Sequence, residues 1–191
     1  MYEAFKDPYC YPGTDVLRNR LNLTDPADLE AFETEITTAR ATEPLPNGRF
    51  GIAHYRAIHR HLFQDVYVWA GNFRTVRIAK GGNAFCYPEY IEPEMVKLFA
   101  QLSAGDGLRQ RNREGFVDGA TTFLADLNQI HPFREGNGRT QLAFMTLLAD
   151  RAGHPLTLEL LNPEAMLQAM IASFHGQTAL LRALLHDLTA A

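Results

Sequence analysis

Apolar residues recur every three or four positions along most of the chain, and this pattern predicts a mostly helical protein. The longest such stretch runs from Glu114 to Ile130. Its apolar positions are Phe116, Val117, Ala120, Phe123, Leu124, Leu127 and Ile130. Because these positions fall on one face of a helix, we expect a long amphipathic helix that packs this face against the core.

The same periodicity predicts six further helices, at 26–41, 52–63, 91–102, 138–151, 163–174 and 177–188. The first of these has a strong N-terminal signal, since Asp25 can cap free backbone amides and Pro26 suits the first helical turn. Residues 1–25 are rich in proline, glycine and aromatic side chains, which favours an ordered arm with a short helix at 15–21. The pattern therefore predicts about seven to eight helices.

The hydrophobic period changes after Trp69. Residues 75–79 alternate between polar and apolar side chains, which is typical of a strand, and Gly81 and Gly82 can form a tight turn. We therefore expect one small β-hairpin within 72–90, beside the helices.

Length and charge narrow the class of protein. With 191 residues and no internal repeat or linker, residues 1–191 are expected to form a single domain. A formal net charge of −4 gives no support to direct nucleic-acid binding, which usually needs a basic surface. No apolar run reaches the roughly 18–20 residues of a membrane span, and the N-terminus lacks the layout of a secretion signal. Cys10 and Cys86 do not make a disulfide framework, so we expect reduced thiols in a cytoplasmic protein without membrane contact.

A chemically dense segment, HPFREGNGR at 131–139, lies between two predicted helices. Gly136 and Gly138 have no side chain that would keep a ligand away from the backbone. The amides near Gly138 lie where the next helix begins, and a helix N-terminus attracts anions through unpaired N–H groups and its dipole. Asn137 adds a neutral donor, and Arg139 adds a permanent charge suited to phosphate. The segment therefore predicts a phosphate-binding loop.

Two further residues of this segment indicate chemistry. Glu135 would repel a phosphate by itself, but it suits Mg²⁺, which takes one or two carboxylates together with phosphate oxygens. His131 ends the long helix beside the loop, and imidazole is the usual general base near neutral pH. Asn128, one helical turn earlier, is placed to orient the imidazole, and Phe133 is expected to anchor the loop in the core. The residues together predict a nucleotide-phosphate site with an adjacent base.

The segment resembles the signature of the Fic (filamentation induced by cAMP) family, H-x-F-x-[D/E]-G-N-G-R-x-x-R, at seven fixed positions. Residues 8–20 and 58–71 also resemble bacterial Fic toxins, so the resemblance extends over roughly 8–188. It implies a Fic-type helical bundle in which 131–142 form the active-site loop and the hairpin is a flap. The flap of this family holds a segment of the target protein by strand-like pairing.

Fic proteins typically transfer AMP from ATP to a hydroxyl side chain of a target protein and release pyrophosphate. By motif position, the resemblance implies that His131 deprotonates the target hydroxyl and Glu135 holds Mg²⁺. It also implies that residues 136–138 cradle the phosphates and that Arg139 binds a phosphate beyond the α position. The implied target-binding residues of the flap are Lys80, Gly81, Gly82, Asn83 and Phe85.

The chain departs from the family signature at Leu142, where the second arginine of the motif would stand. That arginine normally helps to hold the terminal phosphate of ATP. A charge-assisted hydrogen bond contributes about 1.5–3 kcal/mol, so its loss would weaken ATP positioning roughly ten- to hundredfold. Gln141 and Arg134 are candidates to compensate. Three interpretations stay open: an active AMP-transferring toxin, a nucleotide- or target-binding protein with reduced transfer, and an enzyme that uses another donor such as UTP or CDP-choline.

The sequence also bears on regulation. Many Fic proteins carry an inhibitory helix with the motif [S/T]-x-x-x-E-[G/N]. Only Glu114 and Glu135 precede glycine, none precedes asparagine, and the residues four positions before them are Gln110 and His131. Because the motif is absent, the resemblance points to the class inhibited by a small, separate antitoxin protein that supplies this helix. Relatives of this toxin type modify the ATPase subunits of bacterial type II topoisomerases, which gives an expected target.

Overall fold

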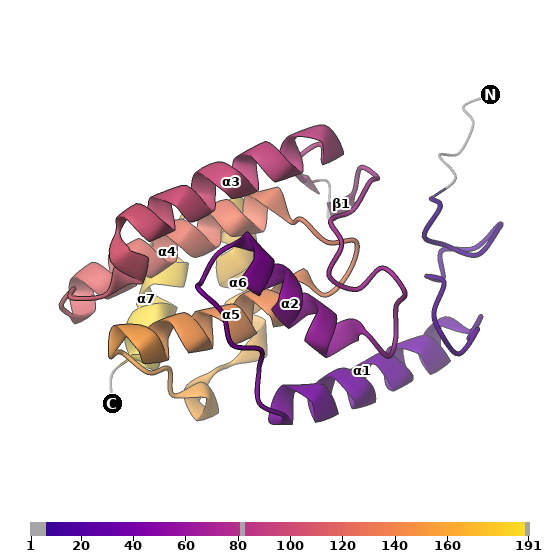
Figure 1. Ribbon diagram of the computed structural model, residues 1–191, viewed down its shortest axis with the longest axis horizontal. Coiled ribbons are helices and arrows are strands. Elements are labelled where there is room, and N and C mark those ends of the chain that lie inside the picture. The colour runs from indigo at the N-terminus through magenta and orange to yellow at the C-terminus, as the bar shows by residue number, and fades with distance from the viewer. Residues whose placement is uncertain (1–6, 81–82, 190–191) are drawn as a thin grey trace.

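The computed structural model describes residues 7–80 and 83–189, and it confirms a mostly helical fold (Figure 1). The helices in these residues are α1 (Pro26–Thr42), α2 (Ile52–Phe63), α3 (Pro88–Ala104), α4 (Arg113–Ile130), α5 (Asn137–Ala152), α6 (Pro163–Phe174) and α7 (Ala179–Leu188). Two short 3₁₀ turns, η1 (Asp106–Leu108) and η2 (Leu158–Leu160), join neighbouring helices. The strands β1 (Ala79–Lys80) and β2 (Asn83–Ala84) form the hairpin.

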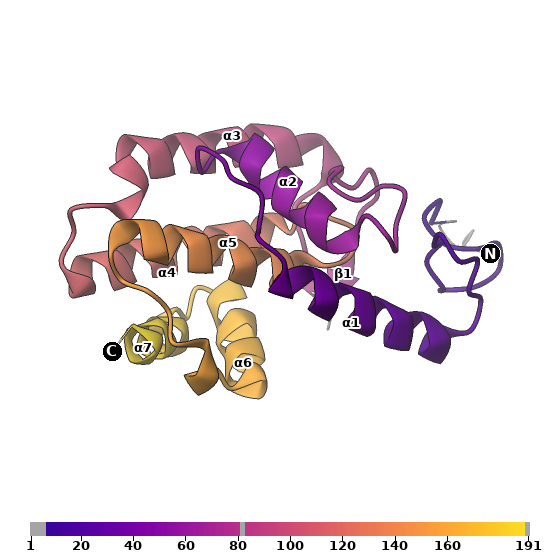
Figure 2. The ribbon, with the colours of Figure 1, turned by 60° about the horizontal axis from the view of Figure 1, so that its bottom comes forward.

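Helix α4 lies at the centre of the fold and contacts α3, α5, α6 and α7. Figure 2 shows α2 and α3 on one side of the layer that contains α4 and α5, with α6 and α7 on the other side. The central position explains why α4 is buried beyond its predicted apolar stripe, at Thr121, Ala125 and Asn128 as well. Helix α1 packs against α2 and brings its polar side chains close to the start of α5.

The local signals that predicted the helix ends also act in the structure. The Asp25 carboxylate accepts hydrogen bonds from the amides of Ala27 and Asp28, and Pro26 occupies the first turn of α1. Asn112 and Asn162 cap α4 and α6 in the same way. These caps satisfy amides that have no partner inside the helix, so they fix where each helix begins.

The short helix expected at 15–21 is wrong. This part of the arm consists of turns, with an isolated antiparallel bridge between Cys10 and Leu17. The Asn19 amide donates to the carbonyls of Leu17 and Leu23, and its oxygen accepts from the Leu23 amide. Side-chain hydrogen bonds of this kind compete with those of a helix, and here they hold the backbone in a non-helical path.

The hairpin exists as predicted, but its strands are shorter than the alternation at 75–79 suggested. Ala79 pairs with Ala84 and Lys80 with Asn83. Next to this pairing, the Arg74 guanidinium donates to the carbonyls of Val76 and Cys86 at 2.6 Å each. A side chain therefore joins the two arms of the hairpin where further strand pairing would otherwise lie.

Candidate functional site

His131 ends α4 in the left-handed conformation, with φ 48° and ψ 62°. This region is uncommon for a residue with a side chain and indicates a site where the surrounding structure imposes the backbone. The His131 amide still donates to Leu127 O, while its carbonyl accepts from Arg74 Nε at 2.8 Å. The chain therefore turns sharply at His131 and enters the phosphate loop.

The imidazole of His131 lines a cavity between α4, α5, α6 and the flap. Its Nδ1 lies 3.3 Å from the carbonyl oxygen of Asn128. Because a carbonyl only accepts, Nδ1 carries the proton in this contact and Nε2 keeps its lone pair. Burial lowers the pKa of His131 from 6.5 to about 4. The ring is therefore neutral near pH 7 and can accept a proton at Nε2.

The aromatic ring of Phe85 covers the imidazole. The two ring centroids lie 3.9 Å apart at an angle of 15°, which is a stacked arrangement. Phe85 follows β2 directly and its amide donates to Ile78 O, so the hairpin holds this ring in place. The flap is thus in direct contact with the candidate base.

Asn128 orients the histidine through its backbone and not through its side chain. The Asn128 side-chain amide donates to Met170 O on α6 at 2.9 Å, whereas its carbonyl contacts His131. The sequence predicted that Asn128 orients the imidazole, and the contact in the structure comes from the Asn128 carbonyl. The side chain instead joins α4 to α6 beneath the cavity.

The loop after His131 forms the N-terminus of α5. Gly136 has φ +79°, and a Cβ atom there would lie 2.2 Å from the Phe63 ring, so this position requires glycine. Gly138 is exposed, and a Cβ atom there would meet no heavy atom within 4 Å. Gly138 therefore leaves open space beside the first turn of α5, at the positive end of the helix dipole, which suits an anion.

Asn137 has a different role from the one that its motif position implied. Its side-chain oxygen accepts from the Phe133 amide at 2.9 Å, and its nitrogen donates to the Phe133 carbonyl at 2.8 Å. Both polar ends of this buried side chain are thus used inside the loop, and neither is free for a phosphate in this conformation. Asn137 closes the loop, and only its backbone amide remains for a ligand.

Phe133 forms the inner anchor of the loop. Its ring is fully buried and stacks on His59 with centroids 3.7 Å apart. His59 accepts a hydrogen bond from the Gly71 amide at Nδ1, so its proton lies on Nε2, which donates to the Glu135 carbonyl at 3.0 Å. The periodicity of α2 placed His59 on the buried face, but no local signal showed that it holds the loop.

Glu135 has a half-exposed carboxylate, and it lies just before the first turn of α5. One of its oxygens accepts from the Gly136 amide at 2.8 Å and lies 3.8 Å from Arg139. Among the described residues, no group of three or more His, Cys, Asp or Glu side chains gathers as a metal site. A single carboxylate next to a phosphate cradle nevertheless suits Mg²⁺, because this ion completes its coordination with phosphate oxygens and water.

Arg139 lies between the phosphate loop and α1. Its guanidinium donates to Thr37 Oγ1 at 2.9 Å and to the Glu33 carboxylate, and it lies above the Phe63 ring. Glu33 also accepts a hydrogen bond from the Tyr67 hydroxyl. The cation is therefore oriented by α1 while its side chain stays about two-fifths exposed toward the loop.

The site opens into a cavity of about 790 Å³. Its polar mouth contains His131, Glu135 and Arg139, and its walls are mostly apolar side chains of α4 to α7, such as Leu124, Met145 and Met170. A polar mouth above an apolar interior suits a molecule with a charged end and a flat, largely apolar body. A nucleotide has both of these parts.

Leu142 lies on the wall of this cavity next to Gln141. Of the two candidates to compensate for the missing arginine, Arg134 is engaged elsewhere, because it donates to Asp7 Oδ2 at 2.8 Å. Gln141 is buried, and its side-chain nitrogen has no hydrogen-bond partner in the described part of the chain. The structure thus leaves Gln141 as the available neutral donor beside Leu142.

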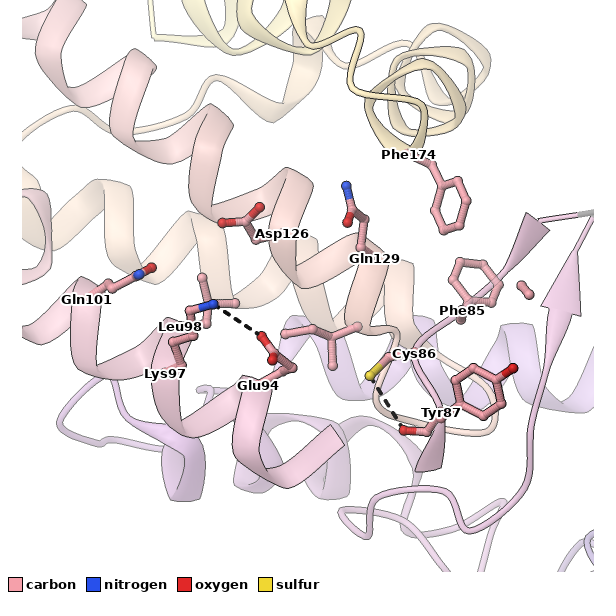
Figure 3. Close-up of a pocket in the computed structure, with 12 residues that line it drawn as sticks. Phe85, Cys86, Tyr87, Glu94, Lys97, Leu98, Gln101, Asp126, Gln129 and Phe174 are labelled. Atoms are coloured by element: carbon pink, nitrogen blue, oxygen red, sulfur yellow. Dashed lines mark hydrogen bonds and ion pairs between the residues drawn. The ribbon is translucent and has the colours of Figure 1, made fainter. Parts of the chain in front are cut away.

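A second cavity, of about 560 Å³, is lined by Phe85 and its neighbours (Figure 3). Flap residues 84–87 line it together with residues of α3 and α4. Its charged lining residues are Glu94, Lys97 and Asp126, and Phe85 and Phe174 line both cavities. Phe85 of the flap therefore takes part in the walls of both cavities.

The sequence-predicted residues are brought together only in part. His131, Glu135, Asn137, Gly138, Arg139 and Leu142 line the same cavity with Lys80 and Phe85 of the flap. Gly136 lies just inside the loop, and Phe133 lies in the core beneath it. Asn83 pairs with Lys80 in the hairpin, while Gly81 and Gly82 lie outside the described residues.

Comparison with known proteins gives the same assignment for the sequence and for the fold. The model of the Fic/DOC family matches residues 49–149. The chain is 56% identical over 183 residues, 95% of each chain, to "Probable protein adenylyltransferase y4lH" of Sinorhizobium fredii. It is 36% identical to protein adenylyltransferase VbhT of Bartonella schoenbuchensis, over 96% of this chain and 39% of VbhT.

Solved structures resemble the chain over nearly its whole length. The N-terminal Fic domain of a VirB-translocated Bep effector protein from Bartonella quintana, a structure with bound ADP, has a TM-score of 0.84. It is 30% identical, and the match covers 94% of this chain and 93% of that one. BepC from Bartonella tribocorum, with bound AMPPNP, has a TM-score of 0.83 at 26% identity, covering 94% and 95% of the two chains.

Proposed function

The chain belongs to the Fic/DOC family, and from this premise we propose that it is a protein adenylyltransferase. It transfers AMP from ATP to a hydroxyl side chain of a target protein. The relatives named protein adenylyltransferase and the similar structures with bound ADP or AMPPNP support this assignment. The observation that carries it is the neutral His131, which lines the same cavity as Gly138 and Arg139 at the N-terminus of α5.

In this proposal, His131 Nε2 takes the proton from the target hydroxyl. The hydroxyl oxygen then forms a bond to the α-phosphorus of ATP, while the bond from that phosphorus to the bridging oxygen breaks and pyrophosphate leaves. The first-turn amides of α5 and the guanidinium of Arg139 stabilise the charge that builds on the phosphate oxygens. His131 needs no deprotonation before the reaction, because its lowered pKa already keeps it neutral.

Glu135 is the residue that would hold Mg²⁺ at the phosphates. When bound, the ion would supply neutralisation of phosphate charge. The carboxylate has the exposure and position for this role, and its bond to the Gly136 amide already fixes the direction of one oxygen.

We also propose that the flap binds the target segment through Lys80, Asn83 and Phe85, of which Lys80 and Phe85 line the cavity with His131. An exposed two-residue strand pair can accept a further extended segment through backbone hydrogen bonds. The cavity of Figure 3 gives a neighbouring side chain of that segment a place to lie. In this view 1–191 form one Fic domain, with 1–25 as arm, 72–90 as flap and 131–142 as active-site loop.

Leu142 supports a second candidate, a protein that binds nucleotide or target but transfers AMP slowly or from another donor. The described structure places no cation at this position of the cavity wall, and Gln141 offers only a neutral donor. A neutral hydrogen bond contributes about 1 kcal/mol less than a charge-assisted one. We therefore propose weakened ATP positioning within an otherwise complete site.

The family resemblance also suggests how the protein is inhibited and where in the cell it acts. We propose that the protein acts as a bacterial toxin in the cytoplasm, restrained by a small antitoxin that supplies the inhibitory helix which the sequence lacks. A surface for such a helix is offered by exposed apolar side chains just before α6 and along it, including Leu160, Leu167 and Ile171. No helix in the described residues is long and apolar enough to cross a membrane. A type II topoisomerase ATPase subunit is the first target to test.

The proposal is tested by incubating the protein with bacterial lysate and ATP that is labelled at either the α- or the γ-phosphate. We expect label on a lysate protein from α-labelled ATP alone, and none with His131→Ala. His175→Ala, which removes an exposed histidine outside the cavity lining, serves as the control and should retain full labelling. If folded wild-type protein gives no label, the proposed AMP transfer is wrong.

A further inference from the structure

Arg74 has a fully buried guanidinium without a carboxylate partner among the described residues. Its exposed fraction is 2%, and none of the ion pairs of the described chain includes it. A buried charge is costly unless hydrogen bonds satisfy it. Arg74 meets this requirement entirely with backbone carbonyl oxygens, since its side chain donates to four of them.

The four carbonyls belong to the two structures that meet at the active site. Arg74 Nε donates to His131 O at 2.8 Å, and Nη2 donates to Ile130 O at 3.2 Å. These oxygens belong to the C-terminal end of α4. Carbonyl groups there lack partners within the helix, and the helix dipole favours a cation. The other two bonds go to Val76 O and Cys86 O, one on each arm of the flap.

The backbone adds a further link. The Arg74 amide donates to Pro132 O at 2.9 Å, and the Cys86 amide donates to Gln129 O at 3.2 Å. Both arms of the flap are thus attached to the end of α4 and the turn that carries His131. The Arg74 guanidinium lies between these two attachments and reaches both.

Only an arginine matches this arrangement. Its guanidinium carries five N–H donors in a fixed plane, whereas a lysine ammonium carries three donors at one point. The four acceptors lie on three backbone segments, at 76, 86 and 130–131, and need donors that point in several directions. A lysine would keep the charge but lose most of the hydrogen bonds.

We propose that Arg74 is the positioning residue that locks the flap to the catalytic turn, so that Phe85 stays stacked on His131 and Nε2 stays aimed at the target hydroxyl. This proposal rests on the proposed AMP transfer. It goes further by making the binding of the target on the flap and the orientation of the base depend on one buried side chain.

The test compares Arg74→Lys and Arg74→Met with Arg109→Met, in which a cation outside the flap is removed. Arg109 is exposed, lies at the opposite end of α4 from His131 and lines neither cavity. We expect kcat for AMP transfer to fall about 100-fold in both Arg74 variants, because a displacement of about 1 Å has an effect of this size. The Kd for ATP should stay unchanged, since Arg74 does not line the nucleotide cavity. Arg109→Met should leave kcat and Kd unchanged.

NMR of the His131 ring protons gives a readout that does not depend on activity. In both Arg74 variants the shift caused by the stacked Phe85 ring should be lost, and it should persist in Arg109→Met. The charged groups that line the cavity with His131 are Lys80, Glu135 and Arg139, while α4 and α6 face it with neutral side chains. These groups are unchanged, and burial is the main cause of the lowered pKa of His131, so release of the Phe85 ring should raise this pKa in both Arg74 variants.

A merely structural role predicts a different outcome: lower thermal stability, with kcat per folded molecule, ring shift and His131 pKa all as in the wild type. That result in the folded Arg74→Lys variant would overturn the proposal. If the wild type itself transfers no AMP, the proposed function fails, while the ring shift and the His131 pKa still decide whether Arg74 locks the flap.

Discussion

His59 occupies the centre of an aromatic cluster, yet it is a polar residue that makes two hydrogen bonds. Its ring stacks on Phe133 and Phe63, and its two nitrogens bond to Gly71 N and Glu135 O. A phenylalanine would keep the stacking but leave two buried backbone groups unpaired. A histidine is therefore needed at position 59 for its hydrogen bonds to the backbone of Gly71 and Glu135, and not for packing in the core.

We predict that His59→Phe lowers the free energy of unfolding by about 2–4 kcal/mol, since each buried unpaired polar group costs about 1–3 kcal/mol. Urea unfolding at pH 7 measures the effect. The exposed His175→Phe is the control and should leave stability unchanged. A destabilisation as small as that of the control would contradict the role assigned to His59.

Leu142 is the single residue of this cavity that departs from the family motif, which has an arginine at this position. We predict that Leu142→Arg lowers the KM for ATP roughly ten- to hundredfold, as a charge-assisted hydrogen bond of about 1.5–3 kcal/mol is gained. Steady-state kinetics of AMP transfer checks this, with Leu142→Met as a control of similar volume and no charge. Equal KM values for all three proteins would show that the terminal phosphate does not reach this wall of the cavity.

At the scale of elements, α1 and the flap determine the chemistry of a loop that is distant from both in the sequence. Glu33 on α1 holds Arg139, which is 106 positions away in the chain. Arg74, near the start of the flap, holds the end of α4. The active-site loop thus has its own amides and carboxylate, but its arginine and its histidine are oriented by other elements.

We predict that Glu33→Gln lowers the KM for ATP about two- to fivefold, because the Glu33 carboxylate competes with phosphate for Arg139 in a partly exposed ion pair. The amide that replaces the carboxylate can still accept a hydrogen bond, so the guanidinium should stay in place. Glu35→Gln, on the exposed side of α1, is the matched control. A rise in KM would indicate that Glu33 assists nucleotide binding instead of competing with it.

The elements that the sequence predicted well are those with local causes. The ranges 52–63 and 163–174 match α2 and α6, because the periodic apolar positions that predicted them lie within each element. The helix expected at 15–21 failed because Asn19 and the bridge between Cys10 and Leu17 take the backbone along another path. Contacts such as those of Asn137 and Arg74 could not be predicted, since they depend on which carbonyls tertiary packing brings near.

At the scale of the whole molecule, two neutral buried histidines couple folding to pH. Burial lowers the pKa of both His59 and His131 from 6.5 to about 4. Between these pH values the unfolded chain binds more protons than the folded one. The contribution of these groups to stability is therefore complete above about pH 6.5 and decreases as the pH falls toward 4.

We predict that the free energy of unfolding falls between pH 7 and pH 4.5, with a contribution from the fully buried His59 on the order of 3 kcal/mol. Urea unfolding across this range measures it, and His59→Phe should flatten the dependence by removing one of the two groups. Stability that stays constant down to pH 4.5 would mean that neither histidine is held neutral by the fold.

We propose that this molecule transfers AMP, and not another group, onto a hydroxyl side chain through His131. Mass spectrometry of a target protein after incubation with ATP tests this transfer, with wild type and His131→Ala side by side. We expect one added AMP on a serine, threonine or tyrosine with the wild type and none with the variant. A different adduct, such as UMP or phosphocholine, or an AMP adduct that persists in His131→Ala, would contradict it.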